Sequence, residues 1–127
     1  MKTFNDNIFN FENLEVYKKM LDYIDLAYAI TGRFPQFEKF ELGKQFRKAS
    51  TSIALNLGEG EGGSPKEYLN FIRISKRSVQ ECLVCTTIAH RRQYISLAEA
   101  EDSRQRLTQI AKMLRGLAGY IQKKIPG

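Results

Sequence analysis

The segment of residues 45–60, QFRKASTSIALNLGEG, constrains the fold of this chain more than any other stretch. Apolar residues recur in and just before it at spacings of three and four, which places them on one face of a helix: Leu42, Phe46, Ala49, Ile53 and Leu57. The opposite face carries Lys44, Arg47 and Lys48. Polar residues lie on or beside the apolar stripe, where they need hydrogen-bond partners: Ser50, Ser52 and Asn56. The segment therefore predicts a core helix with a basic outer face.

The residues that follow predict where this helix ends and the next begins. Glycines at positions 58, 60, 62 and 63 predict a helix stop at residues 58–60 and a short loop after it. Ser64 and Glu67 then form the Ser-x-x-Glu pattern of a capping box, and Pro65 suits the first position of a new helix. Ser96 and Glu99 repeat this pattern. Two helix starts are therefore predicted from local signals alone.

Amphipathic periodicity predicts four long helices separated by short connections. After an irregular lead-in at residues 1–11, we expect helices at 13–31, from 37 or 41 to 57, at 64–92 and at 96–124. Short connections between long amphipathic helices favour an all-α, antiparallel up-down four-helix bundle. The length of 127 residues suits one domain that spans residues 1–127.

The first and third helices each carry two apolar rows, whereas a bundle helix usually needs one apolar stripe. The rows of the first helix are Leu14, Tyr17, Leu21, Ile24 and Tyr28, and Val16, Met20, Tyr23, Ala27 and Ile30. Those of the third are Leu69, Ile72, Val79, Leu83 and Thr86, and Phe71, Ile74, Ser78, Cys82, Cys85 and Ala89. Two interpretations stay open: a wide core face in a small bundle, or a second face that meets another subunit. We favour the second, because closed homo-oligomers are common.

The charge balance of the chain indicates an anionic partner. The sequence has 20 Lys and Arg residues against 14 Asp and Glu residues, a formal net charge of +6. Such an excess favours nucleic acid or acidic protein surfaces, although a solvated basic face is the alternative. The second and third helices contain acid-free basic segments, and the candidate nucleic-acid contacts are Lys44, Arg47, Lys48, Arg73, Lys76 and Arg77. The last helix adds Arg104, Lys112, Arg115, Lys123 and Lys124.

Little in the sequence indicates catalysis or metal binding. Cys82 and Cys85 lie inside a helix on its apolar side, which indicates buried structural cysteines rather than a redox or zinc motif. His90 is the one histidine and is expected at a helix end. Paired carboxylates for acid–base chemistry lack a companion electrophile, so we expect a structural polar cluster that joins the second helix to the third: Ser52, Asn56, Glu59, Glu67 and Glu81. We expect no enzyme activity, no cofactor and no metal.

The sequence also predicts where the protein works. It has no run of about 18 apolar residues, so we expect no membrane-spanning helix. The first residues, MKTFNDNIFNFENLE, lack the uninterrupted apolar stretch of a secretory signal. Two closely spaced cysteines do not make the set typical of a secreted disulfide framework. Together these features predict a cytoplasmic location.

Three motifs resemble those of a known family: FENLEVYKK, FPQFEKFELGKQFRKASTSIALNLGEG and KEYLNFIRISKRSVQE. Over residues 11–124 the chain is similar to the four-helix bundle proteins encoded within 23S ribosomal RNA intervening sequences. The most specific positions are Gln45, Arg47, Ala49, Ser52, Ile53, Asn56, Glu59, Gly60, Glu67 and Glu81. The chain departs from the family where Leu55 and Gly58 replace a commoner Ala. It departs again where Lys76-Arg77 replaces a more usual Arg-Gly pair, which bears on close helix packing at Ser78.

The resemblance implies a cytoplasmic bacterial protein that forms a homo-oligomer, a pentameric ring. It also implies a relation to accessory proteins of diversity-generating retroelements, which bind nucleic acid and a reverse transcriptase through basic surfaces. With the basic segments, it leads us to expect a non-catalytic oligomer that binds RNA or DNA, with structured RNA favoured. The alternative is a protein–protein scaffold, or an accessory subunit of a nucleic-acid-processing protein, that makes no direct nucleic-acid contact.

Overall fold

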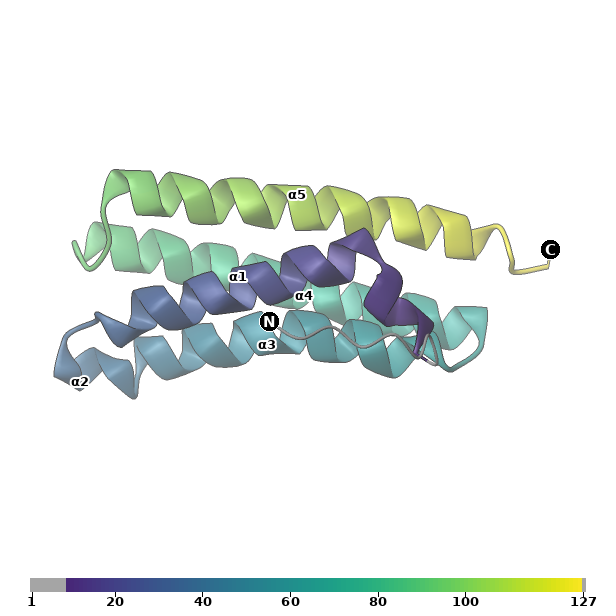
Figure 1. The fold of residues 1–127 in the computed structure, drawn as a ribbon, viewed down its shortest axis with the longest axis horizontal. Helices are drawn as coiled ribbons and strands as arrows, with labels where there is room; N and C mark the ends of the chain where they lie inside the picture. The colour runs from purple at the N-terminus through teal and green to yellow at the C-terminus, as the bar shows by residue number, and fades with distance from the viewer. Residues whose placement is uncertain (1–8, 127) are drawn as a thin grey trace.

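The computed structural model describes residues 9–126 and contains four long helices. The elements are η1 (Asn10–Asn13), α1 (Glu15–Gly32), α2 (Gln36–Lys39), α3 (Leu42–Glu61), α4 (Pro65–Arg91) and α5 (Leu97–Gln122). The long helices lie side by side, and the single-turn α2 sits at one end of the bundle (Figure 1). No strand occurs in the described part of the chain, so the expected all-α class is confirmed. Most of the expected lead-in, and Gly127, lie outside the described residues.

Both predicted capping boxes are present and start the two longest helices. At the start of α4 the Glu67 amide donates to Ser64 Oγ over 3.2 Å, and the Ser64 amide donates to Glu67 Oε1 over 2.9 Å. At the start of α5, Ser96 and Glu99 make the same two bonds over 3.1 and 2.9 Å. The backbone amide of Ser64 lowers the pKa of Glu67, because it stabilises the carboxylate. These bonds satisfy amides that have no partner within the helix.

The predicted stop at residues 58–60 is wrong, because α3 continues for a further turn to Glu61. Gly60 lies buried inside the helix rather than in a loop. A Cβ atom at this position would come within 2.8 Å of the Phe71 Cβ atom on α4. Gly60 therefore allows the two helices to approach closely, and the turn falls at Gly62 and Gly63.

The segment that precedes α3 also differs from expectation. Of the two expected starts, residue 41 is confirmed to within one residue, because α3 begins at Leu42, whereas residue 37 belongs to the separate short α2. Within α3 the predicted core stripe is confirmed, because Leu42, Phe46, Ala49, Ile53 and Leu57 are all buried. They join one core with buried side chains from the other three long helices, such as Met20, Ile72, Ile110 and Leu114.

The favoured interpretation of the two rows on α4, that one of them meets another subunit, is not needed to explain them. Both rows are mostly buried inside this chain, with Ile72, Val79 and Thr86 from one row and Ser78, Cys82, Cys85 and Ala89 from the other. The reason is that α4 packs between two neighbours. Ser78 Oγ lies 2.9 Å from Ser52 Oγ on α3, and Thr86 Oγ1 lies 2.8 Å from Ser103 Oγ on α5. The close packing at Ser78 that Lys76-Arg77 put in question is thus preserved.

On α1 the two rows have different surroundings. The row of Val16, Met20, Tyr23, Ala27 and Ile30 is buried. The other row is only partly covered, and Leu21 and Tyr28 are 39% and 50% exposed. An apolar strip on α1 therefore faces outward from the bundle. None of the helices formed by residues 9–126 is long and apolar enough to cross a membrane.

Candidate nucleic-acid interface

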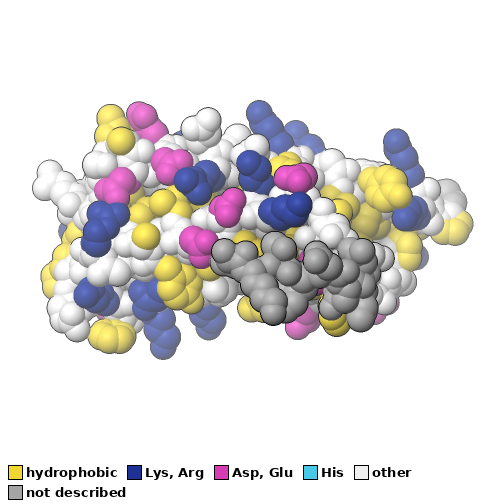
Figure 2. All heavy atoms as spheres, viewed as in Figure 1, with side chains coloured by type: hydrophobic (Ala, Val, Ile, Leu, Met, Phe, Trp, Pro, Cys, Tyr) yellow, Lys and Arg dark blue, Asp and Glu magenta, His cyan; other side chains and the backbone are white. Residues whose placement is uncertain are grey.

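Five of the six predicted contact residues present their side chains on the outer surface of the bundle. Lys44 and Lys48 are exposed on α3, one helical turn apart. Arg73, Lys76 and Arg77 are exposed on α4. At the lower left edge of the face in Figure 2, along the first half of α3, basic side chains project with no acidic side chain between them. The two acid-free segments of the sequence therefore both lie on the surface.

The sixth predicted residue, Arg47, has a structural role. Its side chain is half-buried, and Nη2 donates a hydrogen bond of 3.0 Å to the backbone oxygen of Lys39. The guanidinium also covers Gly43, where a Cβ atom would come within 3.0 Å of Arg47 Nη1. Arg47 thus fastens the end of α2 to α3, and this use of the side chain limits its reach toward a ligand.

The exposed basic residues are not neutralised by neighbouring acids. In residues 9–126 the ion pairs join Lys18 to Glu15, Arg33 to Glu99, and Arg106 to Asp102. None of these pairs includes a predicted contact residue. Arg73 does bond to a neutral group, because its Nη2 donates to Asn70 Oδ1 over 2.6 Å. The positive charges on α3 and α4 are therefore available to an anion from solution.

A shallow groove of about 710 Å³ lies beside the basic residues of α3. Its lining comes mainly from α3, with one acidic residue from α4: Phe40, Glu41, Lys44, Gln45, Lys48, Ala49, Ser52 and Glu81. Gln45 Nε2 donates to Glu81 Oε2 over 3.3 Å across the groove. Lys44 and Lys48 thus stand beside a carboxylate, which makes this groove less positive than the predicted list suggests.

The predicted structural polar cluster does not form as a single unit. Asn56 Nδ2 donates to the Ser52 backbone oxygen over 2.8 Å and to Ser52 Oγ over 2.9 Å, so Asn56 bonds within α3 rather than to the start of α4. The Glu67 carboxylate accepts a hydrogen bond from the Ser64 amide in the capping box of α4. Glu81 accepts a hydrogen bond from Gln45, and Glu59 is exposed on α3. Two members do join α3 to α4, because Ser78 bonds to Ser52 and Gln45 bonds to Glu81, but residues near one another in the motif did not all become neighbours in space.

The cysteines and the histidine lie where the sequence predicted. Cys82 and Cys85 are free thiols buried in α4, and burial raises the pKa of Cys85 to about 11 and that of Cys82 as well. His90 is exposed in the last turn of α4. Among residues 9–126, no three or more His, Cys, Asp and Glu side chains are grouped so that they could hold a metal ion.

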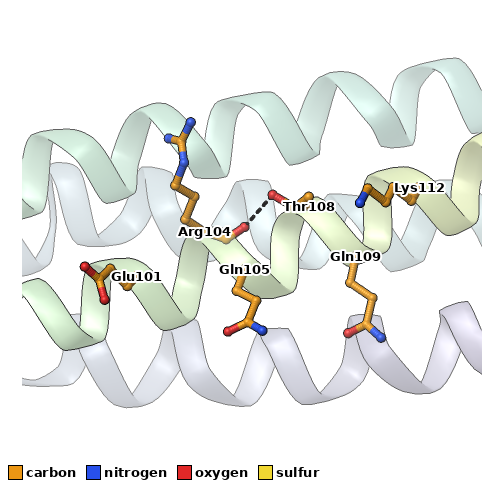
Figure 3. Close-up of a pocket in the computed structure, with 6 residues that line it drawn as sticks. All are labelled: Glu101, Arg104, Gln105, Thr108, Gln109 and Lys112. Atoms are coloured by element: carbon orange, nitrogen blue, oxygen red, sulfur yellow. Dashed lines mark hydrogen bonds between the residues drawn. The ribbon is translucent and has the colours of Figure 1, made fainter.

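A further basic surface lies on α5, outside the predicted list of contacts. A shallow hollow of about 540 Å³ there is lined by Glu101, Arg104, Gln105, Thr108, Gln109 and Lys112. Figure 3 shows Arg104 extending over the neighbouring helix, with Thr108 and Lys112 on the same side of α5. Gln105 and Gln109 point the other way (Figure 3). The spacing of four between Arg104, Thr108 and Lys112 is the sequence signal for this surface.

Comparisons with known proteins agree with this fold. A family model described as 23S rRNA-intervening sequence protein matches residues 12–116. A solved structure from Bacteroides thetaiotaomicron, a protein of unknown function from the S23 ribosomal protein family, is similar with a TM-score of 0.71. It is 23% identical in sequence, and the match covers 81% of this chain and 97% of that protein. No curated protein matches the chain.

Proposed function

The chain belongs to the 23S rRNA-intervening sequence protein family, and on that premise we propose that it is a non-catalytic oligomer that binds nucleic acid through basic helix faces. The proposal includes an antiparallel up-down bundle, a closed ring of five copies, a cytoplasmic location and structured RNA as the favoured ligand. It also includes the relation to retroelement accessory proteins that the sequence motifs imply.

One observation carries the proposal: exposed basic side chains on α3 and α4 have no acidic partner within ion-pair distance in residues 9–126. Those side chains are Lys44, Lys48, Arg73, Lys76 and Arg77. Unpaired surface Lys and Arg attract the phosphate backbone and release its counterions, a contribution that does not depend on base sequence.

The oligomeric part of the proposal rests on α1. Leu21 and Tyr28 are apolar side chains that the chain leaves 39% and 50% exposed. Burial of such a strip against a second copy removes apolar surface from water. Assembly into a ring repeats every basic face around it, so weak phosphate contacts add up to stronger binding.

The experiment is a salt titration of binding to a structured RNA hairpin, read by fluorescence anisotropy. We expect the logarithm of affinity to fall steeply with the logarithm of salt, by roughly 0.9 per phosphate neutralised in a duplex. Lys48→Glu combined with Arg73→Glu should abolish binding and leave helical circular dichroism unchanged. Lys18→Glu on α1 is a control for charge reversal away from these faces and should retain affinity. Equal affinity of the double variant and the wild-type protein would overturn the proposal.

A second candidate function is a scaffold that binds another protein. Apolar side chains on α4 and near the start of α3 support it, because Phe40, Val84 and Ile88 are 68%, 56% and 40% exposed. Val84→Ser combined with Ile88→Ser discriminates between the two candidates. This variant should bind the RNA hairpin normally if nucleic acid is the ligand. A scaffold predicts instead no RNA binding by the wild-type protein at low salt, and loss of self-association or partner binding in the variant.

A further inference from the structure

A line of positive charge runs along the outer side of α5. Arg104, Thr108, Lys112 and Arg115 follow one another at spacings of four, four and three, which keeps them on one side of the helix. All four are exposed. Figure 3 shows Arg104 reaching from this side over α4, while Gln105 and Gln109 point away toward α1. The line therefore borders the seam between α5 and α4.

One basic residue of α4 borders the same seam. A hollow between the two helices is lined by Leu83 and Thr87 of α4 together with Arg104 of α5, so these α4 residues face α5. Lys76 precedes Leu83 by seven positions and Thr87 by eleven, which are two and three helical turns. Lys76 therefore lies on the side of α4 that faces α5.

The register between the helices places these charges close together. Thr86 Oγ1 lies 2.8 Å from Ser103 Oγ, and the two helices lie side by side from the turn at residues 92–96 (Figure 1). Lys76 is ten positions before Thr86, so it is level with the position ten after Ser103, between Lys112 and Arg115. Basic residues from two helices thus converge along one seam.

Acidic residues are absent from most of the seam, and Glu101, which lines the hollows beside Arg104, lies at the end near the turn. The sequence has no Asp or Glu from residue 68 to 80 on α4, or from residue 104 to the end of α5. In the described part of the chain, Lys76, Arg104, Lys112 and Arg115 form no ion pair, and the two pairs that involve α5 join Arg106 to Asp102 and Arg33 to Glu99. The α3 groove has Glu41 and Glu81 beside Lys44 and Lys48, so it holds two carboxylates where the seam hollows hold one, Glu101.

Apart from His90, which lines the hollow beside Arg104, the described part of the seam has few exposed rings on which unpaired bases could stack. The exposed aromatic residues within 9–126 are Phe9, Tyr28, Phe37, Phe40 and Tyr120. Of these, only Tyr120 is on α4 or α5, and it lies near the end of α5. Proteins that bind single strands combine a basic groove with such aromatic platforms. Basic charge with a single such ring, His90, suits a ligand whose bases are already stacked within a double helix.

We propose that the α4–α5 seam, with Lys76, Arg104, Lys112 and Arg115, binds the sugar–phosphate backbone of a double-helical nucleic acid. This inference rests on the proposed function; it adds the seam to the α3 and α4 faces named there, and it gives the class of ligand. The stretch from Arg104 to Arg115 extends about 16 Å at about 1.5 Å per residue, so it follows several successive phosphates of one strand. Backbone recognition of this kind is indifferent to base sequence.

The test compares two charge-matched double variants of the full chain. Arg104→Gln with Lys112→Gln removes two charges from the seam, and Lys44→Gln with Lys48→Gln removes two from the α3 face. The probes are an RNA hairpin of about 20 base pairs, a DNA hairpin of the same sequence, and an unpaired oligouridine strand. Circular dichroism verifies that each variant is folded.

We expect the seam variant to lose about tenfold or more in affinity for both hairpins, and its log–log salt slope to fall by about 2. Both hairpins should bind more tightly than oligouridine. Normal hairpin binding by the seam variant together with loss in the α3 variant would overturn the inference and leave the proposed function intact. Tighter binding of oligouridine than of the hairpins would also overturn it. If the wild-type protein binds none of the probes at low salt, both proposals fail.

Discussion

The phenolic oxygen of Tyr23 on α1 lies 2.8 Å from the hydroxyl oxygen of Ser103 on α5, eighty positions later in the chain. Ser103 Oγ lies 2.8 Å from Thr86 Oγ1 on α4, and Thr86 donates to the Cys82 backbone oxygen over 2.9 Å. Each hydroxyl has one proton, so the donors must run in order from Tyr23 to Ser103 to Thr86. This buried chain of hydroxyls ties three helices to one register.

Replacement of Tyr23 by Phe should lower the free energy of unfolding by about 1 kcal/mol, because Ser103 loses a buried donor. Urea unfolding monitored by circular dichroism measures the change. Tyr28→Phe is the matched control, because Tyr28 is half exposed on the same helix, and it should leave stability unchanged. Equal stability of the two variants would show that the Tyr23 hydroxyl contributes nothing.

Gly60→Ala should destabilise the protein by about 1–3 kcal/mol, because the new methyl group meets the Phe71 Cβ atom, which cannot rotate away. Gly116→Ala on α5 is the control, since no atom lies within 4 Å of the Cβ position there. That variant should be more stable by about 0.5–1 kcal/mol through helix propensity. Thermal unfolding of both variants tests the contrast, and a stabilised Gly60→Ala would contradict close contact between α3 and α4.

Arg47→Ala should lower stability by about 1–2 kcal/mol, because the Lys39 backbone oxygen loses a charged donor and Gly43 loses its cover. Lys48→Ala removes the same charge one position later from an exposed site, and should change stability by less than about 0.5 kcal/mol. Urea midpoints of the two variants provide the comparison. A similar small effect in both would mean that Arg47 is free to serve a ligand.

The ion pair between Glu99 and Arg33 should make the protein sensitive to acid. The Arg33 hydrogen bond, with help from the Ser96 amide, lowers the pKa of Glu99 below its ordinary value of 4.5. A carboxyl group with a lowered folded pKa contributes stability that is present above its unfolded pKa and is lost as the pH falls through the folded value. Unfolding free energy should therefore decrease below about pH 4.5, and less so in Glu99→Gln.

Arg33→Gln provides the check on this prediction, because it removes the other partner and leaves the α5 capping box in place. It should reduce the acid sensitivity as Glu99→Gln does. Urea unfolding at a series of pH values compares the three proteins. An undiminished fall in stability in both variants would assign the acid sensitivity to other carboxyl groups.

The two cysteines should react slowly while the protein is folded. Burial raises the pKa of Cys85 to about 11, so at pH 8 only about one thiol in a thousand is the reactive thiolate. Both side chains are also covered by neighbouring residues. We expect an aromatic disulfide reagent to label them at the rate at which the bundle opens, and rapidly in guanidinium. Rapid labelling of the native protein would place at least one thiol at the surface.

The sequence predicted those features that depend on neighbouring residues. The capping boxes at Ser64 and Ser96 were predicted correctly, because each needs only a hydroxyl and a carboxylate three positions apart. The apolar stripe of α3 was also predicted, since its period alone places Phe46 and Ile53 on one buried face. The family resemblance rested on the same local motifs and is confirmed over residues 12–116.

The tertiary structure decided what depends on residues far apart in the chain. From its neighbours in the sequence, Gly60 is predicted to stop a helix. Only the close approach of Phe71 explains why a glycine lies inside α3. The sequence pattern predicts that Arg47 is a surface charge. In the structure, the turn after α2 brings the Lys39 carbonyl close enough to accept a hydrogen bond from Arg47. The bond from Tyr23 to Ser103 has no sequence signal, because contacts between helices depend on the register and rotation that packing selects. A periodic pattern specifies which side of each helix is buried, but the partner of each side chain is chosen only when all four helices share one core.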